Sequence, residues 1–230
     1  MKTVSQNPSY EVNRSLEHLL LEPQLTEAET LAGCSMASSY GLGSVCVKPC
    51  YVRAAAALLR NESIALGTVI AFPYGSSVTH SKVVETKRAL TEGAIELSLS
   101  INFGTLLDEK TILFCEDIKA VCGLAHMNGA KANVIIDVDL ITQEQFKLAG
   151  KLALEAGADW ISPTSGFLSG IVAPQYYQWL RDAVGEKVQI KAMGPLNSHN
   201  EYLTLIDHGV RRVAAPLTKT ILEDILEGSK

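Results

Sequence analysis

Short runs of apolar residues alternate along the chain with longer segments in which apolar residues recur at helical spacing. The runs have the length of buried strands, and short polar connections separate them from the longer segments. This alternation predicts βαβ units, in which helices cover a parallel sheet. The predicted strands span residues 16–21, 44–47, 64–72, 95–101, 132–137, 160–161, 188–192 and 211–214.

Helices are expected between these strands, and two of them open with a capping box, at Thr26–Glu29 and Thr142–Gln145. Eight strand–helix units without a linker or repeat predict an α/β fold, for which a single (β/α)₈ TIM barrel is the economical interpretation. Periodicity alone does not separate this closed barrel from an open, doubly wound sheet. The barrel is expected over residues 16–230, after a flexible lead-in at residues 1–15. The expected helices span 26–40, 52–59, 79–92, 108–128, 142–156, 174–183, 200–208 and a last segment ending near 226.

Composition narrows the class of protein further. The 230 residues are 47% hydrophobic and carry a net charge of −5, without a basic patch, so no nucleic-acid partner is expected. No apolar stretch is long enough to cross a bilayer, and the N-terminus has no apolar signal region. The five cysteines form no CxxC pair, so we expect reduced thiols, no metal site and a cytoplasmic location.

Several segments carry a recognisable pattern in a fixed order. They are LEHLLLEPQLTEAE, SVCVKPCYV, TVIAFPYGSSVTHSKVVETK, GAIELSLSIN, ANVIID, GADWISPTSGF, VQIKAMGPL and GVRRVAAPL. Over roughly residues 16–225, their order and spacing resemble the 2-deoxyribose-5-phosphate aldolase family. The resemblance implies the TIM barrel, a small-molecule carbonyl ligand, no cofactor and, by analogy, a homodimer.

The resemblance also implies a chemistry based on three charged groups. In the family, a lysine amine attacks the carbonyl of the substrate, and the resulting imine accepts the electrons of the bond that breaks. A second lysine lowers the pKa of the first by like-charge repulsion. A carboxylate relays the proton through water.

The catalytic positions of this chain depart from that pattern. The Schiff-base lysine is replaced by Ser162, which cannot form an imine, and the relay aspartate by Ser98. A further lysine of the family becomes Asn133, while an aspartate near the first strand becomes Glu17. Only the second lysine has a counterpart, Lys191, expected at the C-terminal end of its strand.

The turns that bind phosphate in the family are altered as well. Glycine-rich turns after the last two strands offer backbone N–H groups to the phosphate. Here they read Gly194-Pro195-Leu196 and Ala214-Ala215-Pro216, so two prolines remove two donors. Recognition of a 5-phosphate is therefore expected to be lost. The resemblance places the remaining substrate contacts at Cys46, Asn133, Asp137, Thr164, Gly166 and Gly194.

Two interpretations of Lys191 remain open. It is either an imine-forming nucleophile in its own right or a vestigial lysine paired with Glu17 or Asp137. A lysine without a cationic neighbour stays mostly protonated near neutral pH, which favours the second interpretation. A pairing of a pocket serine with His18 is a further alternative. Solvent exposure is expected for Lys48, Lys82 and Lys87.

The expected function follows from the loss of several groups together. Groups that act as a unit cost several orders of magnitude in rate when they are removed. The sequence thus predicts an aldolase-like pseudoenzyme with a small-molecule pocket or an interaction role. The first alternative is a lyase or cyclase that acts on an unphosphorylated carbonyl compound through Lys191. The second is a genuine deoxyribose-phosphate aldolase.

Overall fold

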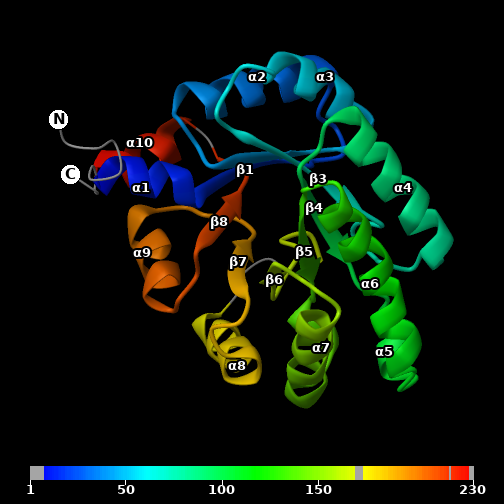
Figure 1. Cartoon of the computed structure of the whole chain (residues 1–230). Helices are drawn as coiled ribbons and strands as arrows, with labels where there is room; N and C mark the ends of the chain where they lie inside the picture. The colour runs from blue at the N-terminus through cyan, green and yellow to red at the C-terminus, as the bar shows by residue number, and fades with distance from the viewer. Residues whose placement is uncertain (1–7, 169–172, 218, 228–230) are drawn as a thin grey trace.

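Eight parallel strands close into a barrel in which each strand pairs with its neighbours in chain order and β8 returns to β1 (Figure 1). The structure, a computed structural model, describes residues 8–168, 173–217 and 219–227. The predicted TIM barrel is confirmed. The strands are β1 (Leu16–Leu20), β2 (Ser44–Val47), β3 (Ala65–Ile70), β4 (Glu96–Ser100), β5 (Lys131–Ile135), β6 (Trp160–Ser162), β7 (Gln189–Met193) and β8 (Arg212–Ala215).

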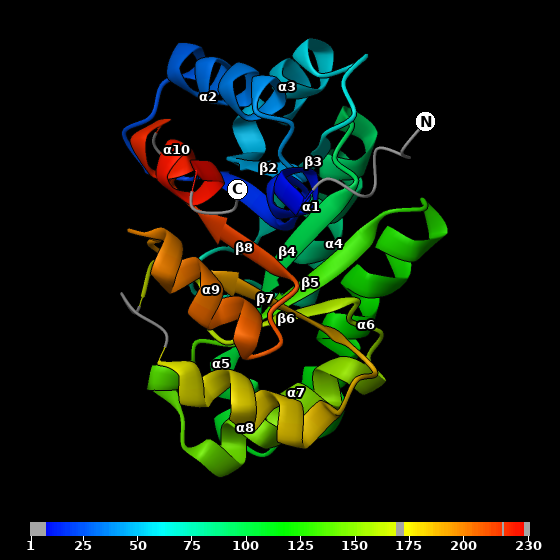
Figure 2. The same ribbon diagram turned by 90° about the vertical axis from the view of Figure 1, so that its left-hand side faces the viewer.

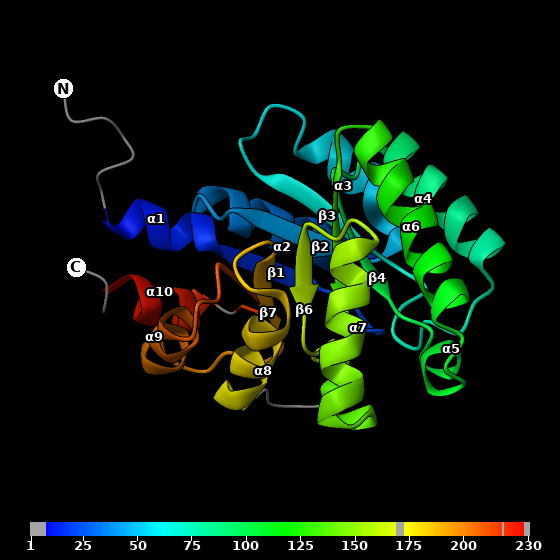
Figure 3. The same ribbon diagram turned by 60° about the horizontal axis from the view of Figure 1, so that its bottom comes forward.

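Helices surround the strands, as views from two further sides show (Figure 2, Figure 3). The first and last helices lie side by side, so the two ends of the described chain are close together. No described helix is long and apolar enough to span a membrane. The helices are α1 (Pro8–Ser15), α2 (Glu27–Ser39), α3 (Val52–Leu58), α4 (Thr79–Glu92), α5 (Phe103–Leu107), α6 (Thr111–Met127), α7 (Gln143–Glu155), α8 (Pro174–Val184), α9 (His199–Asp207) and α10 (Lys219–Glu227), with 3₁₀ turns η2 (Pro49–Tyr51) and η3 (Val138–Leu140).

Both predicted capping boxes are confirmed. The Glu29 backbone N–H donates to Thr26 Oγ1 at 3.3 Å, and the Thr26 N–H donates to Glu29 Oε2 at 2.8 Å. Thr142 and Gln145 exchange the same two bonds at the start of α7. These reciprocal bonds satisfy donors that the first helical turn leaves free, which fixes where α2 and α7 begin.

The helix predicted over residues 108–128 is present as α6, which begins three residues later and ends one residue earlier, and a short helix that was not predicted, α5, precedes it. Asn102 caps α5 by accepting the Gly104 N–H at 3.0 Å. Glu109 then takes a left-handed φ of +59°, which interrupts the helical path before Thr111.

The lead-in expected at residues 1–15 contains a regular element. Residues 8–15 form α1, and residues 1–7 lie outside the described part. Polar side chains fasten the end of α1 to the barrel: Asn13 Nδ2 donates to the Tyr40 carbonyl at 2.6 Å, and Arg14 Nη1 donates to the Ser63 carbonyl at 2.5 Å. These long-range bonds explain why the segment before β1 is helical here.

Lys82 is not solvent-exposed as the sequence predicts. Its side chain is fully buried between α4 and α6, where its amine forms an ion pair with Asp117. A buried lysine needs a carboxylate partner because an unpaired charge is costly in an apolar environment. The partner lies on the next long helix, and sequence spacing cannot indicate it.

Strand alternation sorts the core into two parts. Most buried apolar side chains lie between the strands and the helices, on the outer face of the barrel wall. A second, smaller cluster fills the barrel interior near the C-terminal ends of the strands. We call it the interior plug; it comprises Leu19, Cys46, Val69, Ile135, Met193 and Ala214.

Candidate functional site

Lys191 lies inside the barrel and is paired with Glu17. It is the middle residue of β7, so the expected position at the C-terminal end of the strand is wrong. The amine lies 2.6 Å from Glu17 Oε2, and the two side chains are only 3% and 1% exposed. Of the two carboxylates considered from the sequence, Lys191 contacts the one on β1. The amine is therefore enclosed against Glu17 inside the barrel.

Three further polar residues surround this pair. Ser44 Oγ donates to Glu17 Oε2 at 2.8 Å, and Arg212 Nη1 lies 3.7 Å from the same oxygen. Arg212 also donates to both carboxylate oxygens of Glu96, at 2.7 and 2.6 Å. The cluster thus contains two cations and two carboxylates, whose charges balance.

The charges of the cluster stabilise one another in spite of burial. Burial raises the pKa of Glu17, but the charges of Lys191 and Arg212 outweigh this effect and hold the pKa below its ordinary value. Burial likewise opposes the charge of Arg212, and Glu96 and Glu17 raise its pKa. Glu17 therefore stays ionised and is the ion-pair partner of Lys191.

The interior plug separates this cluster from the C-terminal mouth of the barrel. On β1, β7 and β8, its members Leu19, Met193 and Ala214 follow Glu17, Lys191 and Arg212 by two positions, one step nearer the mouth. Cys46 was expected to contact the substrate. It belongs instead to the plug and is 1% exposed, so it does not face an open site. Burial, with the Glu17 charge, raises the pKa of the Cys46 thiol.

The positions that the resemblance assigns to catalysis form a neutral hydrogen-bond chain. Ser162 Oγ donates to Asn133 Oδ1 at 3.0 Å, and Asn133 Nδ2 donates to Ser98 Oγ at 3.2 Å. All three side chains are buried. The structure therefore brings together the three positions that the sequence singled out, as uncharged groups that satisfy one another. None of them contacts a described base that could activate a hydroxyl.

Asp137 anchors the loop that follows β6. Its Oδ1 accepts the Ser165 backbone N–H at 2.7 Å, Ser165 Oγ at 2.9 Å and Thr164 Oγ1 at 3.3 Å. Burial raises the pKa of Asp137, and the bonds from Ser165 and Thr164 oppose that shift. Asp137 and Thr164 thus hold the loop in place, which is a positioning role for two predicted contact residues.

Gly166 and Gly194 bring the loops after β6 and β7 into contact. A Cβ on Gly166, whose φ is +70°, would lie 2.6 Å from the Gly194 Cα, so no larger residue fits. The Gly194 N–H donates to the Ala214 carbonyl and the Gly166 N–H to Thr164 Oγ1, each at 3.0 Å. Both glycine donors are therefore engaged within the protein.

Carboxylates of the protein occupy the start of α9. The N–H groups at a helix start attract anions, including phosphate. Here Asn197 N–H donates to Glu201 Oε2 at 2.8 Å, and His199 N–H donates to Asp224 Oδ2 at 2.9 Å. A phosphate at this helix start would have to displace two fixed negative charges.

His18 and Lys48 serve the scaffold. His18 faces α2, on the side of β1 opposite to Glu17, and its Nδ1 accepts the Leu217 N–H at 3.0 Å. Burial lowers the pKa of His18 to about 4. The proposed pairing with a serine is therefore wrong. Lys48 Nζ donates to the carbonyls of Glu22, Pro23 and Leu25, which fixes the loop after β1.

The outer members of the charged cluster were not predicted from the sequence. Ser44, Glu96 and Arg212 precede Cys46, Ser98 and Ala214 by two positions, so they face the same interior. The period-2 alternation could have identified them. Among the described residues, no three His, Cys, Asp or Glu side chains are grouped to hold a metal ion.

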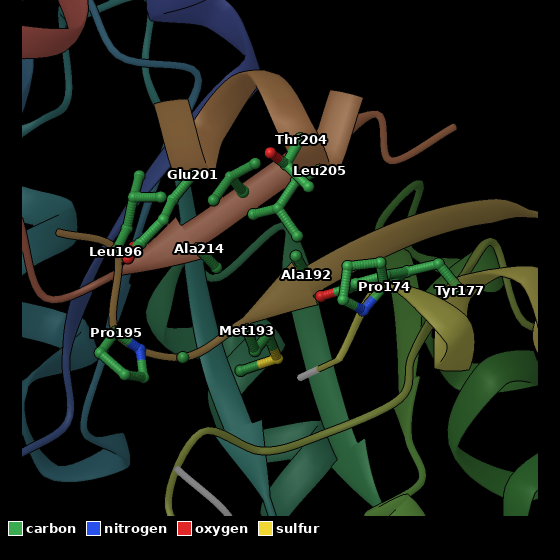
Figure 4. A pocket seen from close by; sticks show the side chains of 12 residues that line it. Pro174, Tyr177, Ala192, Met193, Pro195, Leu196, Glu201, Thr204, Leu205 and Ala214 are labelled. Carbon is green, nitrogen blue, oxygen red and sulfur yellow. The ribbon is translucent and has the colours of Figure 1, made fainter. Parts of the chain in front are cut away.

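Two apolar cavities adjoin the turn after β7. The first, here the mouth cavity, has a volume of about 280 Å³ and lies at the C-terminal ends of the strands. The second, of about 200 Å³, lies between α8 and α9 (Figure 4). Gly194 and Pro195 line both. The mouth cavity is lined by Leu19, Leu21, Glu22, Phe72, Ser165, Gly166, Phe167, Gly194, Pro195 and Pro216.

Comparison with known proteins relates this barrel to one family. The chain is 35% identical over 215 residues to deoxyribose-phosphate aldolase 1 of Bacillus licheniformis, covering 94% of this chain and 96% of that protein. It is also 35% identical over 215 residues to deoxyribose-phosphate aldolase of Thermococcus kodakarensis, covering 93% and 96%. The chain belongs to the deoxyribose-phosphate aldolase family. No protein-family model matches it.

Solved structures agree with this membership of the deoxyribose-phosphate aldolase family. The aldolase QR15 superposes with a TM-score of 0.86 at 25% identity and covers 94% of this chain and 95% of its own. A tetrameric deoxyribose phosphate aldolase of Aeropyrum pernix shares the fold, with a TM-score of 0.86 at 22% identity, covering 96% and 92%. The homodimer expected from the sequence stays a prediction.

Proposed function

We propose that this member of the deoxyribose-phosphate aldolase family is a pseudoenzyme that holds a small molecule without forming an imine. The observation that carries the proposal is the burial of Lys191 against Glu17, at 2.6 Å, beneath the interior plug. An imine forms only when a free amine reaches the carbonyl carbon of the substrate. A charged amine enclosed by its carboxylate partner meets neither requirement.

The changes around Lys191 support the same proposal. Ser162, at the position of the Schiff-base lysine, is bonded to Asn133, and no acid or base remains at Ser98. Prolines stand in both phosphate turns, the glycine donors are engaged, and carboxylates hold the start of α9. Imine formation, proton relay and phosphate binding are thus all disfavoured by separate contacts.

The names of the relatives favour a second candidate function. Both curated relatives described above are deoxyribose-phosphate aldolases, and they match almost the whole chain. Under this candidate, Lys191 would leave Glu17 and attack a carbonyl compound. That step requires the buried pair to open, the amine to lose its proton and the plug to move aside.

A direct assay of acetaldehyde release separates the two candidates. The purified protein is incubated with 2-deoxyribose 5-phosphate, and acetaldehyde is measured by coupling to alcohol dehydrogenase and following NADH. We expect no release above a blank without protein, because the catalytic and phosphate-binding groups are missing together. The aldolase of Bacillus licheniformis serves as the positive control. Release that depends on protein concentration and disappears in Lys191→Met would contradict the proposal.

A further inference from the structure

The mouth cavity has the position of a TIM-barrel ligand site and an apolar lining. Its walls come from the ends of β1, β7 and β8 and from the loops after β3 and β6. Ligands of this fold bind at that end of the barrel. Phe72 and Phe167 both line the cavity and contact each other edge to face, with ring centroids 5.6 Å apart. Phe167 is 48% exposed, so a ligand could cover its ring.

The charge of the lining selects against anions. Among the described residues that line the mouth cavity, none is Lys, Arg or His, and Glu22 is the single ionisable side chain. Pro195 and Pro216 have no N–H to donate, and the N–H groups of Gly166 and Gly194 are engaged. An anion would therefore lose its hydration without gaining a partner, and would be repelled by Glu22.

We infer that the mouth cavity binds an uncharged, largely apolar molecule of about one or two rings, held by the aromatic pair Phe72–Phe167. This inference rests on the proposed function, since it assigns a ligand class to the same site. The volume of about 280 Å³ is just below the usual range for small-molecule pockets, which suits a small ligand, and the lining provides area for apolar burial. The family's sugar phosphate has the opposite properties, being polar and anionic.

Two fluorescent probes that differ by one charge test the inference. 1-Naphthylamine is uncharged near neutral pH and has two fused rings, and 5-aminonaphthalene-1-sulfonate has the same ring system with a sulfonate. We expect saturable binding of the first probe to the folded protein and at least about tenfold weaker binding of the second. Glu22→Gln should narrow that difference. Millimolar inorganic phosphate should not displace the uncharged probe.

Paired variants assign the binding to one cavity. Leu21→Trp fills the mouth cavity and should weaken binding of the uncharged probe at least about tenfold, whereas Thr204→Phe, in the cavity between α8 and α9, should not change it. If Leu21→Trp does not fold, Phe167→Ser is the substitute, since its exposed ring is not needed for the core. Circular dichroism checks that each variant is folded.

Several results would overturn the inference. They are the absence of saturable binding, equal binding of both probes, displacement by phosphate, or a loss of binding in Thr204→Phe alone. Acetaldehyde release would instead contradict the proposed function. The two failures are distinguishable, because a protein that binds the uncharged probe and also cleaves 2-deoxyribose 5-phosphate would retain the apolar site and lose the pseudoenzyme assignment.

Discussion

Replacing Glu17 by glutamine is expected to lower the free energy of unfolding by about 3–5 kcal/mol. The reason is that Lys191, 3% exposed, has no other described carboxylate as an ion-pair partner, so its charge would stay buried without compensation. Lys191→Met should lower the free energy of unfolding by less, near the lower end of this range. In this variant Glu17 retains two partners, the Arg212 guanidinium at 3.7 Å and the hydrogen bond from the Ser44 hydroxyl. Urea denaturation followed by circular dichroism measures both.

The double variant Glu17→Gln/Lys191→Met is the control for this prediction. It removes both charges together, so most of the lost stability should return, and the two single effects should be strongly non-additive. Additive effects, or single losses below about 1 kcal/mol, would show that water reaches the pair. In that case Lys191 would be accessible enough to react, and the structural interpretation of the pair would be wrong.

Stability is expected to fall as the pH drops from about 6.5 to 4, and His18 is expected to cause a large part of this loss. Its pKa is lowered from 6.5 to about 4 by burial, so the unfolded chain binds a proton in this range and the folded protein does not. The difference corresponds to about 3 kcal/mol when fully developed. Protonation would also remove the acceptor of the Leu217 N–H.

The variant His18→Asn isolates this contribution. The asparagine side-chain oxygen can accept the Leu217 N–H but does not titrate, so stability should depend less on pH between 6.5 and 4. Both proteins contain the same carboxylates, which include Asp137 and Glu85 with raised pKa values. The contribution of the carboxylates to the pH dependence therefore cancels when the unfolding midpoints of the two proteins are compared at each pH. Parallel pH profiles would show that His18 is protonated in the folded protein as easily as in the unfolded chain.

Most of the barrel could be predicted from the sequence because its signals are local. Apolar runs, capping threonines and short connections define βαβ units without reference to distant residues. The resemblance to the family then distinguished the closed barrel from an open sheet, and the structure confirms the barrel. The errors arose where long-range contacts decide the structure. The burial of Lys82 depends on Asp117 of another helix, and α1 depends on bonds to residues that are 27 and 49 positions away.

The candidate site was predicted in composition but not in arrangement. The sequence identified Ser162, Ser98 and Asn133 as one set, and the structure joins them by hydrogen bonds. It could not show whether Lys191 turns toward the mouth or toward Glu17, because a long side chain in the middle of a strand can point either way. The interior plug was also missed, since it is assembled from single residues of six strands.

These contacts describe how the interior of this barrel is organised. The family scaffold is intact, while the interior of the barrel is divided into a balanced charged cluster below and an apolar plug above. Ser162, Asn133 and Ser98 are hydrogen-bonded to one another, so a charged side chain placed at one of these positions would disturb contacts within the barrel.

The most direct test of this account is reductive trapping at Lys191. The folded protein is treated with acetaldehyde and sodium cyanoborohydride, and each lysine is then quantified by peptide mapping. We predict adducts on exposed lysines such as Lys87 and Lys151 and none on Lys191, which should react only after unfolding in urea. A saturable adduct on Lys191 of the folded protein, formed as fast as on the exposed lysines or faster, would contradict the account.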